Sequence, residues 1–320
     1  LPPGAAMRRL PFVNGSGEET APLYGDIGTF AYYFLDIMVG NPQQRVSVIL
    51  DSGSSLMAFP CGGCQHCGQH LDPAFKFDQS TTARWLSCPE CPGQACEHDR
   101  CAYNQAYQEG SSIHGYRFRD FVSLGEADDF NPPDAAVMGC HTEETKLFVT
   151  QKANGILGVA PSRGGFPTIL QDLFSTADIR QRQFAICLAS EGGSLRVGRA
   201  HEEMHTGAVT WVNMSATSYY LVDLTSIGIG ATPLPPMDFG RTLVDSGTTF
   251  VYFPSRVFSA AVEQVIQYCG TGACSGPVTK APDGTFCVQL PENIPRHQLD
   301  LMPQLTFTFG HGAATTTWWG

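Results

Sequence analysis

The chain has 320 residues and a mass of 34.6 kDa, roughly twice the usual size of one domain, so we expect two units. Apolar residues make up 42% and charged residues 15%, with 34 Gly and 22 Pro, which excludes a disordered chain or a coiled coil and favours a turn-rich globular protein. The net charge of −11 and the pI of about 5.2 argue against partners that are nucleic acids or anionic lipids.

The cysteine content indicates the compartment. Twelve cysteines are many for a cytosolic protein, because reducing conditions there keep thiols free. We therefore expect a secretory or extracellular protein. The sequence contains neither a run of 18 apolar residues nor a signal peptide, so we expect a processed form or a fragment, with any membrane attachment made by a segment outside it.

The order of apolar and turn residues predicts a mostly β chain. Residues 1–28 are rich in Gly, Pro and Ser and are expected to form a flexible lead-in. Residues 61–101 hold seven cysteines with little strand pattern, so we expect a disulfide-stapled insertion outside the core. In chain order, apolar patterns predict strands at 33–39, 46–50, 116–124, 137–139, 155–159, 184–187, 195–198, 219–229 and 242–245, and helical spacing predicts helices after Pro167 and Pro254.

A short motif is repeated after two of these strands. Residues 51–54 read Asp-Ser-Gly-Ser and residues 245–248 read Asp-Ser-Gly-Thr, each directly after an apolar run. A single Asp-Ser-Gly is most often only a turn, but two copies in the same context indicate a function. The predicted site consists of the pair Asp51 and Asp245, supported by Ser52, Gly53, Ser54, Ser246, Gly247 and Thr248.

Two aspartates brought together by related lobes have a specific chemistry. Both cannot ionise cheaply, so the pair shares one proton. The ionised carboxylate activates a water while the protonated one donates to a peptide carbonyl oxygen, which produces a tetrahedral diol without a covalent intermediate. Glycine lets backbone amides approach the carboxylates, and the hydroxyls orient them. This chemistry requires no cofactor and no metal.

From Phe30 onward the sequence resembles pepsin-like aspartic proteases. The segment Gly40-Asn41-Pro42-Gln43 before Asp51, the segment at residues 107–111 and the segment at residues 154–158 follow the order of that family. The cysteine-rich stretch 59–70 and the later Gly-Cys-His at residues 139–141 look like the plasmepsin V subgroup of apicomplexan proteases, which carries a nepenthesin-type insertion. The resemblance implies a bilobal pepsin-like fold, with an N-terminal lobe at 29–180 and a truncated C-terminal lobe at 181–320.

The resemblance also assigns roles to residues outside the motifs. Tyr107 matches the flap tyrosine that closes over substrate, with Gly110 in the same turn. Glu109 and Gln151 fall where plasmepsin V holds the arginine of an Arg-x-Leu sequence, cleaved after the leucine in secretory proteins within the endoplasmic reticulum or another endomembrane lumen. Glu109 is alternatively an ordinary exposed charge in a hairpin. Residues 57–59 lack the tryptophan of pepsins, so flap anchoring is expected to differ.

The cysteines allow two interpretations. The spacing Cys61-x2-Cys64-x2-Cys67, with His66 and His70 nearby, suits a tetrahedral zinc ion. The resemblance instead implies disulfides, for which we expect the pairs Cys61–Cys140, Cys64–Cys67, Cys88–Cys101 and Cys91–Cys96. Cys187, Cys269, Cys274 and Cys287 belong to the second lobe.

Two functions remain as alternatives to an enzyme. The first is a pepsin-fold protein that binds or inhibits without cutting, although such proteins usually lose one aspartate and both are kept here. The second is a zinc-binding cysteine-rich module. The main interpretation is an aspartic endopeptidase with polypeptide substrates.

Overall fold

The structure is a computed structural model, and it describes residues 18–93, 95–125, 134–162, 165–176, 179, 181–198, 207–216, 218–274, 278–280, 286–288, 302–310 and 314–318. Residues 1–17 of the lead-in expected at 1–28 lie outside this description, and the expectation is wrong for Glu19–Asp26, which form a strand of the sheet with Ala21 and Leu23 buried. The fold is mostly β, as the sequence predicted. Its contacts form two units, one of Leu1–Thr206 with Asp245–Thr249 and one of Gly207–Val244 with Phe250–Gly320. The lobe boundary expected after residue 180 stays a prediction.

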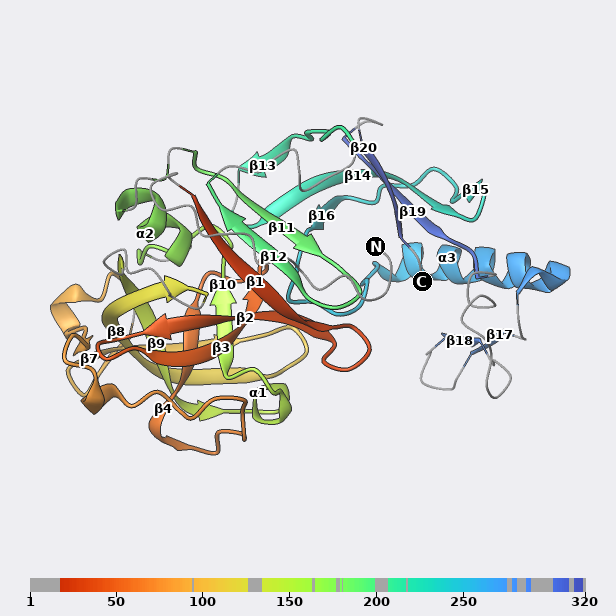
Figure 1. The fold of residues 1–320 in the computed structure, drawn as a ribbon. Helices are drawn as coiled ribbons and strands as arrows, with labels where there is room; N and C mark the ends of the chain where they lie inside the picture. The colour runs from red at the N-terminus through yellow and green to blue at the C-terminus, as the bar shows by residue number, and fades with distance from the viewer. Residues whose placement is uncertain are drawn as a thin grey trace. The chain divides into compact units, whose positions relative to one another are not determined.

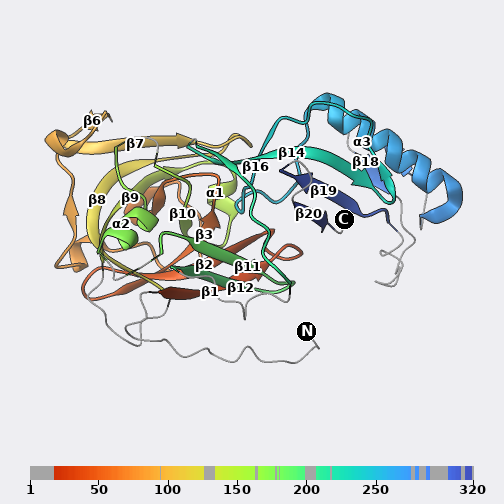
Figure 2. The same cartoon turned by 90° about the horizontal axis from the view of Figure 1, so that it is seen from above.

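The larger unit is built on one sheet of twelve strands, in the order β11-β12-β1-β2-β3-β10-β4-β9-β8-β7-β6, with β5 paired to β8 (Figure 1). Short helices are η1 (Phe77–Gln79), η2 (Cys88–Glu90), α1 (Leu147–Thr150) and α2 (Ile169–Thr176), and α2 packs on β9 (Figure 2). The strands are β1 (Glu19–Asp26), β2 (Tyr32–Val39), β3 (Gln44–Asp51), β4 (Met57–Gln65), β5 (Arg84–Trp85), β6 (Cys96–Glu97), β7 (Arg100–Ala106), β8 (Ser112–Leu124), β9 (Asp134–Glu144), β10 (Gly155–Gly158), β11 (Phe184–Leu188) and β12 (Gly193–Val197).

The core of this unit explains why the strands form where the sequence predicted them. β2 alternates fully buried Leu35, Ile37 and Val39 with more exposed neighbours, and most of β3 is buried. An extra pairing between β2 and β8 closes the strands β2, β3, β10, β4, β9 and β8 into a ring. The strand that ends at Asp51 is therefore held on both sides, by β2 and by β10.

The smaller unit packs one helix on a second sheet. Val257 and Ala261 of α3 join Leu224, Ile227 and Phe307 in a separate core. The sheet runs β13-β14-β19-β20, with β15 and β16 also paired to β14, and β17 pairs with β18. The elements are β13 (Met214–Ala216), β14 (Tyr220–Ile229), β15 (Thr232–Pro233), β16 (Arg241–Leu243), α3 (Ser255–Tyr268), the π-helix η4 (Cys269–Ala273), β17 (Val278–Lys280), β18 (Phe286–Val288), β19 (Leu305–Phe309) and β20 (Ala314–Trp318).

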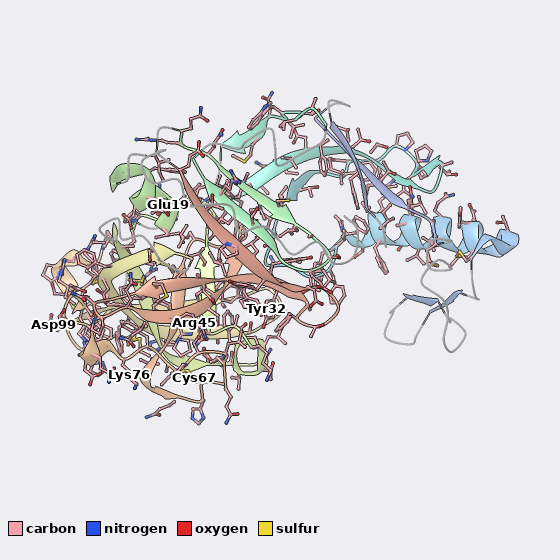
Figure 3. The ribbon with its side chains drawn as sticks, viewed as in Figure 1. Glu19, Tyr32, Arg45, Cys67, Lys76 and Asp99 are labelled. Atoms are coloured by element: carbon pink, nitrogen blue, oxygen red, sulfur yellow. A yellow bond between two sulfur atoms is a disulfide. The ribbon has the colours of Figure 1, made fainter. Side chains whose placement is uncertain are left out.

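The disulfides correct part of the expected pairing. The structure contains Cys61–Cys140 and Cys64–Cys67, as expected, together with Cys269–Cys274; Cys67 is labelled in Figure 3. The expected pairs Cys88–Cys101 and Cys91–Cys96 are wrong, because the bonds are Cys88–Cys96 and Cys91–Cys101. The helix η2 separates Cys88 from Cys91 by one tight turn, so that one faces β6 and the other β7. Cys187 is exposed and free.

The disulfides argue against the interpretation of the cysteines as zinc ligands. The thiols of Cys61, Cys64 and Cys67 are all used in disulfides, so the thiolates that the spacing could have offered to a metal are absent. Within the described part of the chain, no group of three or more His, Cys, Asp or Glu side chains could hold a metal ion. Among the same residues, no helix is long and apolar enough to cross a membrane.

Candidate active site

Asp51 stands at the end of a rigid element. It is the last residue of β3, which pairs in parallel with β10 so that Gly158 lies opposite Asp51. The N–H of Val159 donates to the carbonyl oxygen of Asp51 at 2.8 Å, and Asp51 as a whole is 5% exposed. The buried apolar run before the motif thus aims one carboxylate from a fixed backbone position.

Each motif holds its own aspartate in the same way. In the first copy the N–H of Gly53 donates to Oδ1 of Asp51 at 2.8 Å, and the hydroxyl of Ser54 donates to Oδ2. In the second copy the N–H of Gly247 donates to Oδ1 of Asp245 at 2.9 Å, and the hydroxyl of Thr248 donates to Oδ2 at 2.6 Å. The repeated sequence therefore folds into a repeated set of carboxylate contacts.

The two motifs also bond to each other, and by their contacts both belong to the larger unit. The N–H of Ser52 donates to Oγ of Ser246 at 3.0 Å, and the N–H of Ser246 donates to Oγ of Ser52 at 2.9 Å. The hydroxyl of Ser246 in turn donates to the carbonyl oxygen of Leu50 at 2.7 Å. This reciprocal exchange fixes the separation of the two aspartates that precede the serines.

The glycines are required because the opposite carboxylate lies against each of them. A Cβ added to Gly53 would lie 2.5 Å from Oδ2 of Asp245, and a Cβ added to Gly247 would lie 2.5 Å from Oδ1 of Asp51. Both distances are far below an ordinary contact. A side chain at either position would push the carboxylates apart.

The proximity of the carboxylates changes the electrostatics of Asp51. The pKa of Asp51 is raised from 3.8 to about 7, first by burial and then by the charge of Asp245, against the lowering effect of the hydrogen bonds from Ser54 and Gly53. A proton is therefore kept on the pair at pH values where an ordinary aspartate is ionised. Such a pair has the acid and the base that direct attack of water on an amide needs.

Tyr107 lies at the start of the turn between β7 and β8. Its N–H donates to the carbonyl oxygen of Ser111 at 2.9 Å, and its ring centroid lies 5.0 Å from that of Phe148. Burial, and then the charge of Asp51, raise the pKa of the Tyr107 phenol. Phe148, in α1 after β9, is buried against the Tyr107 ring; how the flap is anchored stays a prediction.

Of the remaining predicted residues, Glu109 and Gly110 lie in this turn and Gln151 lies at the end of α1. Glu109 and Gly110 are exposed, and the side-chain amide of Gln151 donates to the carbonyl oxygen of Ala153 at 3.1 Å. Their roles in binding stay predictions. Lys146 is an additional charged residue at the turn, since its Nζ would lie 2.6 Å from a Cβ on Gly110. Nothing in the polar sequence around Lys146 distinguished it from an ordinary surface lysine.

Comparison with known proteins places this geometry in a family. Residues 32–289 match the family described as Eukaryotic aspartyl protease. The chain is 42% identical over 290 residues to Plasmepsin V of Plasmodium falciparum, covering 74% of this chain and 49% of that protein. It is 39% identical over 285 residues to Aspartic protease 5 of Toxoplasma gondii, covering 71% and 29% respectively. It is 27% identical over 282 residues to Aspartic proteinase nepenthesin-2 of Nepenthes gracilis, covering 80% and 60%.

The chain thus spans half or less of the length of the first two of these relatives. The family match nevertheless extends over most of the chain and includes both Asp-Ser-Gly motifs and the flap turn. Together with the mostly β fold and the paired motifs, it shows that the chain belongs to the eukaryotic aspartyl protease family.

Proposed function

We propose that this protein is an aspartic endopeptidase in which Asp51 and Asp245 are the catalytic pair. The observation that carries the proposal is the reciprocal hydrogen bonding of Ser52 and Ser246, which holds two carboxylates against each other's glycine. A turn with no catalytic role would not need a second, distant copy of itself in that position.

Each residue of the proposed site has a separate role in peptide hydrolysis. The pair holds one proton, so one carboxylate activates a water and the other donates to the carbonyl oxygen of the scissile peptide. The raised pKa of Asp51, about 7, supports a pair that keeps this proton at mildly acidic and neutral pH. Ser54 and Thr248 orient the outer carboxylate oxygens, and Tyr107 closes over the substrate.

The substrates that we propose are polypeptides of the secretory pathway with an arginine on the amino-terminal side of the cleaved bond, as in Arg-x-Leu. The resemblance to plasmepsin V supports this choice, with Glu109 and Gln151 as the groups that hold the arginine. Five disulfides support an oxidising compartment such as the lumen of the endoplasmic reticulum. The negative net charge favours a basic substrate over a polyanion.

The activity is tested with a peptide library and analysis of the products by mass spectrometry. We expect internal cleavage, inhibition by a statine peptide that imitates the tetrahedral diol, and no inhibition by reagents directed at serine or cysteine nucleophiles. Peptides that are bound and remain intact would contradict the proposal and favour a protein that only binds.

The arginine preference is tested with Glu109→Ala. A desolvated contact between carboxylate and guanidinium contributes roughly 2 to 4 kcal/mol, so kcat/KM for an Arg-x-Leu peptide should fall roughly 30- to 1000-fold. A peptide with Ala in place of Arg should be cleaved as before. Glu191→Ala, which removes the same charge from an exposed position before β12, is the matched control. Equal losses on both peptides would make Glu109 a residue that shapes the flap and would contradict the arginine preference.

A further inference from the structure

A buried cluster of ionisable side chains lies next to the root of the flap, and the proposed hydrolysis does not use it. The side chains of His70, His141 and Glu144 are 4%, 0% and 0% exposed. His70 comes from the cysteine-rich insertion, whereas His141 and Glu144 belong to β9. Glu144 pairs across the sheet with Ile113 of β8, the strand that returns from the flap turn.

The hydrogen-bond partners of His70 indicate which of its ring nitrogens carry protons. One ring nitrogen of His70, Nδ1, lies 3.1 Å from the carbonyl oxygen of Gln151, which can only accept. The other, Nε2, lies 3.1 Å from Oε2 of Glu144. If Glu144 is ionised, that atom also only accepts, so both nitrogens of His70 must carry a proton. The ring is then a buried cation paired with a buried anion.

The surroundings of Glu144 support the ionised form. Nδ1 of His141 lies 2.9 Å from Oε1, and the N–H of Gly68 donates to Oε2 at 3.1 Å. Burial raises the pKa of Glu144, but the hydrogen bonds from His141 and His70 outweigh it and bring the pKa down to about 2. Burial lowers the pKa of His141, so that ring is neutral, and its Nε2 is buried without a hydrogen-bond partner among the described residues.

His70 contacts the backbone carbonyl of Gln151, a predicted substrate-binding residue. The segment after Gln151 is tied down as well. Oη of Tyr32, labelled in Figure 3, accepts the N–H groups of Lys152 and Ala153 at 2.8 and 3.1 Å, and the N–H of Leu71 donates to the carbonyl oxygen of Lys152 at 2.8 Å. The insertion therefore reaches the backbone of Gln151 through His70 and that of Lys152 through Leu71.

We propose that His70 is a positioning residue for substrate selection: its ring, protonated on both nitrogens and held by Glu144, fixes the carbonyl of Gln151 and so the place where that residue meets a substrate arginine. This inference rests on the proposed arginine-reading role of Gln151. It gives the cysteine-rich insertion a function in specificity in addition to its structural bridges. His70 touches neither the substrate nor the carboxylate pair, so its effect should be confined to the choice of substrate.

The test compares two variants that differ only at residue 70. Glu144→Gln removes the buried charge, and its amide can donate to Nε2 of a neutral His70 that still donates to Gln151. The double variant Glu144→Gln with His70→Leu removes the donor to Gln151 without leaving a charge buried. We expect Glu144→Gln to keep the wild-type ratio of kcat/KM for an Arg-x-Leu peptide over its Ala counterpart. The double variant should lose roughly 10- to 100-fold of that ratio, through a higher KM for the Arg peptide.

A second measurement determines the protonation state of the His70 ring directly. Long-range proton–nitrogen NMR of the wild-type protein should show both ring nitrogens of His70 protonated, and one of them bare in Glu144→Gln. An unchanged preference in a folded double variant, or a singly protonated wild-type ring, would overturn the inference and leave the proposed function standing. A wild-type protein that cleaves peptides without preferring arginine would instead overturn the arginine-reading role itself, and the specificity role of His70 with it.

Discussion

Asp51 ends a buried strand that has a paired strand on each side, whereas Asp245 follows β16, a strand of three residues that pairs with β14 within the described residues. The two aspartates receive the same bonds from their own motifs, yet Asp51 is buried and Asp245 only half-buried. The comparison separates the cause of a carboxylate's orientation from the cause of its burial. The motif sets the orientation of each carboxylate, and the surrounding strands set its burial and hence the electrostatic environment.

The largest expected effects follow from replacing the glycine of each motif by alanine, and the two variants should differ in stability. Gly247→Ala sets its methyl against the carboxylate of the rigidly held Asp51, and Gly53→Ala sets it against that of Asp245. We expect both variants to lose at least about 100-fold in kcat, because a misplacement near 1 Å is enough for such a loss. Overpacking should also destabilise Gly247→Ala by roughly 1 to 3 kcal/mol, and Gly53→Ala by less.

Urea denaturation and peptide cleavage measure both effects. Gly62→Ala in β4 is the control, because its Cβ would meet nothing closer than the carbonyl oxygen of Phe75 at 3.8 Å. Equal destabilisation in the two motif variants would show that the strands around Asp51 add no rigidity to it.

The bond between the motifs can be broken without touching either carboxylate. Ser246→Ala removes the hydroxyl that accepts the N–H of Ser52 and donates to the carbonyl oxygen of Leu50. Losing these partly buried hydrogen bonds should lower the free energy of unfolding by roughly 1 to 3 kcal/mol. Ser175→Ala on α2 removes an exposed hydroxyl that donates to Gln171, which water replaces, and should change stability little. If Ser246→Ala and Ser175→Ala unfold at similar urea concentrations, the hydrogen bonds between the two motifs do not stabilise the fold.

The smallest expected effect is a change in pH dependence. The pKa of Asp51, about 7, lies above that of the unfolded chain, so the shared proton is held below this pH and lost as pH rises through it. The alkaline limb of kcat/KM should therefore fall near pH 7. The hydroxyl of Ser54 stabilises the ionised form, so Ser54→Ala should move that limb to higher pH, and Ser54→Thr should leave it in place. A limb that moves to lower pH in Ser54→Ala would contradict this assignment.

The sequence predicted those features that are local. The apolar runs predicted the strands that carry both motifs, and the repeated Asp-Ser-Gly predicted which side chains would meet, because the same residues form the same turn wherever they occur. The absence of a tryptophan after Asp51 predicted a different flap anchor, which stays a prediction; Tyr107 packs on Phe148.

Features that depend on distant contacts were missed. The insertion was expected to lie outside the core, which is wrong for Phe75: it is fully buried and stacks on Phe118 of β8 at 5.6 Å. The aromatic residues of a polar, cysteine-rich stretch do not reveal their packing partners in the sequence. The buried contact between His70 and Glu144 was missed for the same reason, since ionisable residues are usually exposed and only the folded chain shows that these two are not.

The central claim is that Asp51 and Asp245 act as one unit, and the most direct measurement is a double-substitution cycle on peptide cleavage. We expect Asp51→Asn and Asp245→Asn each to abolish activity and the double variant to be no worse than either, because removing one member already removes the shared proton chemistry. Thermal unfolding checks that the variants fold. Partial losses that add in the double variant, or a single variant that keeps substantial activity, would contradict the account.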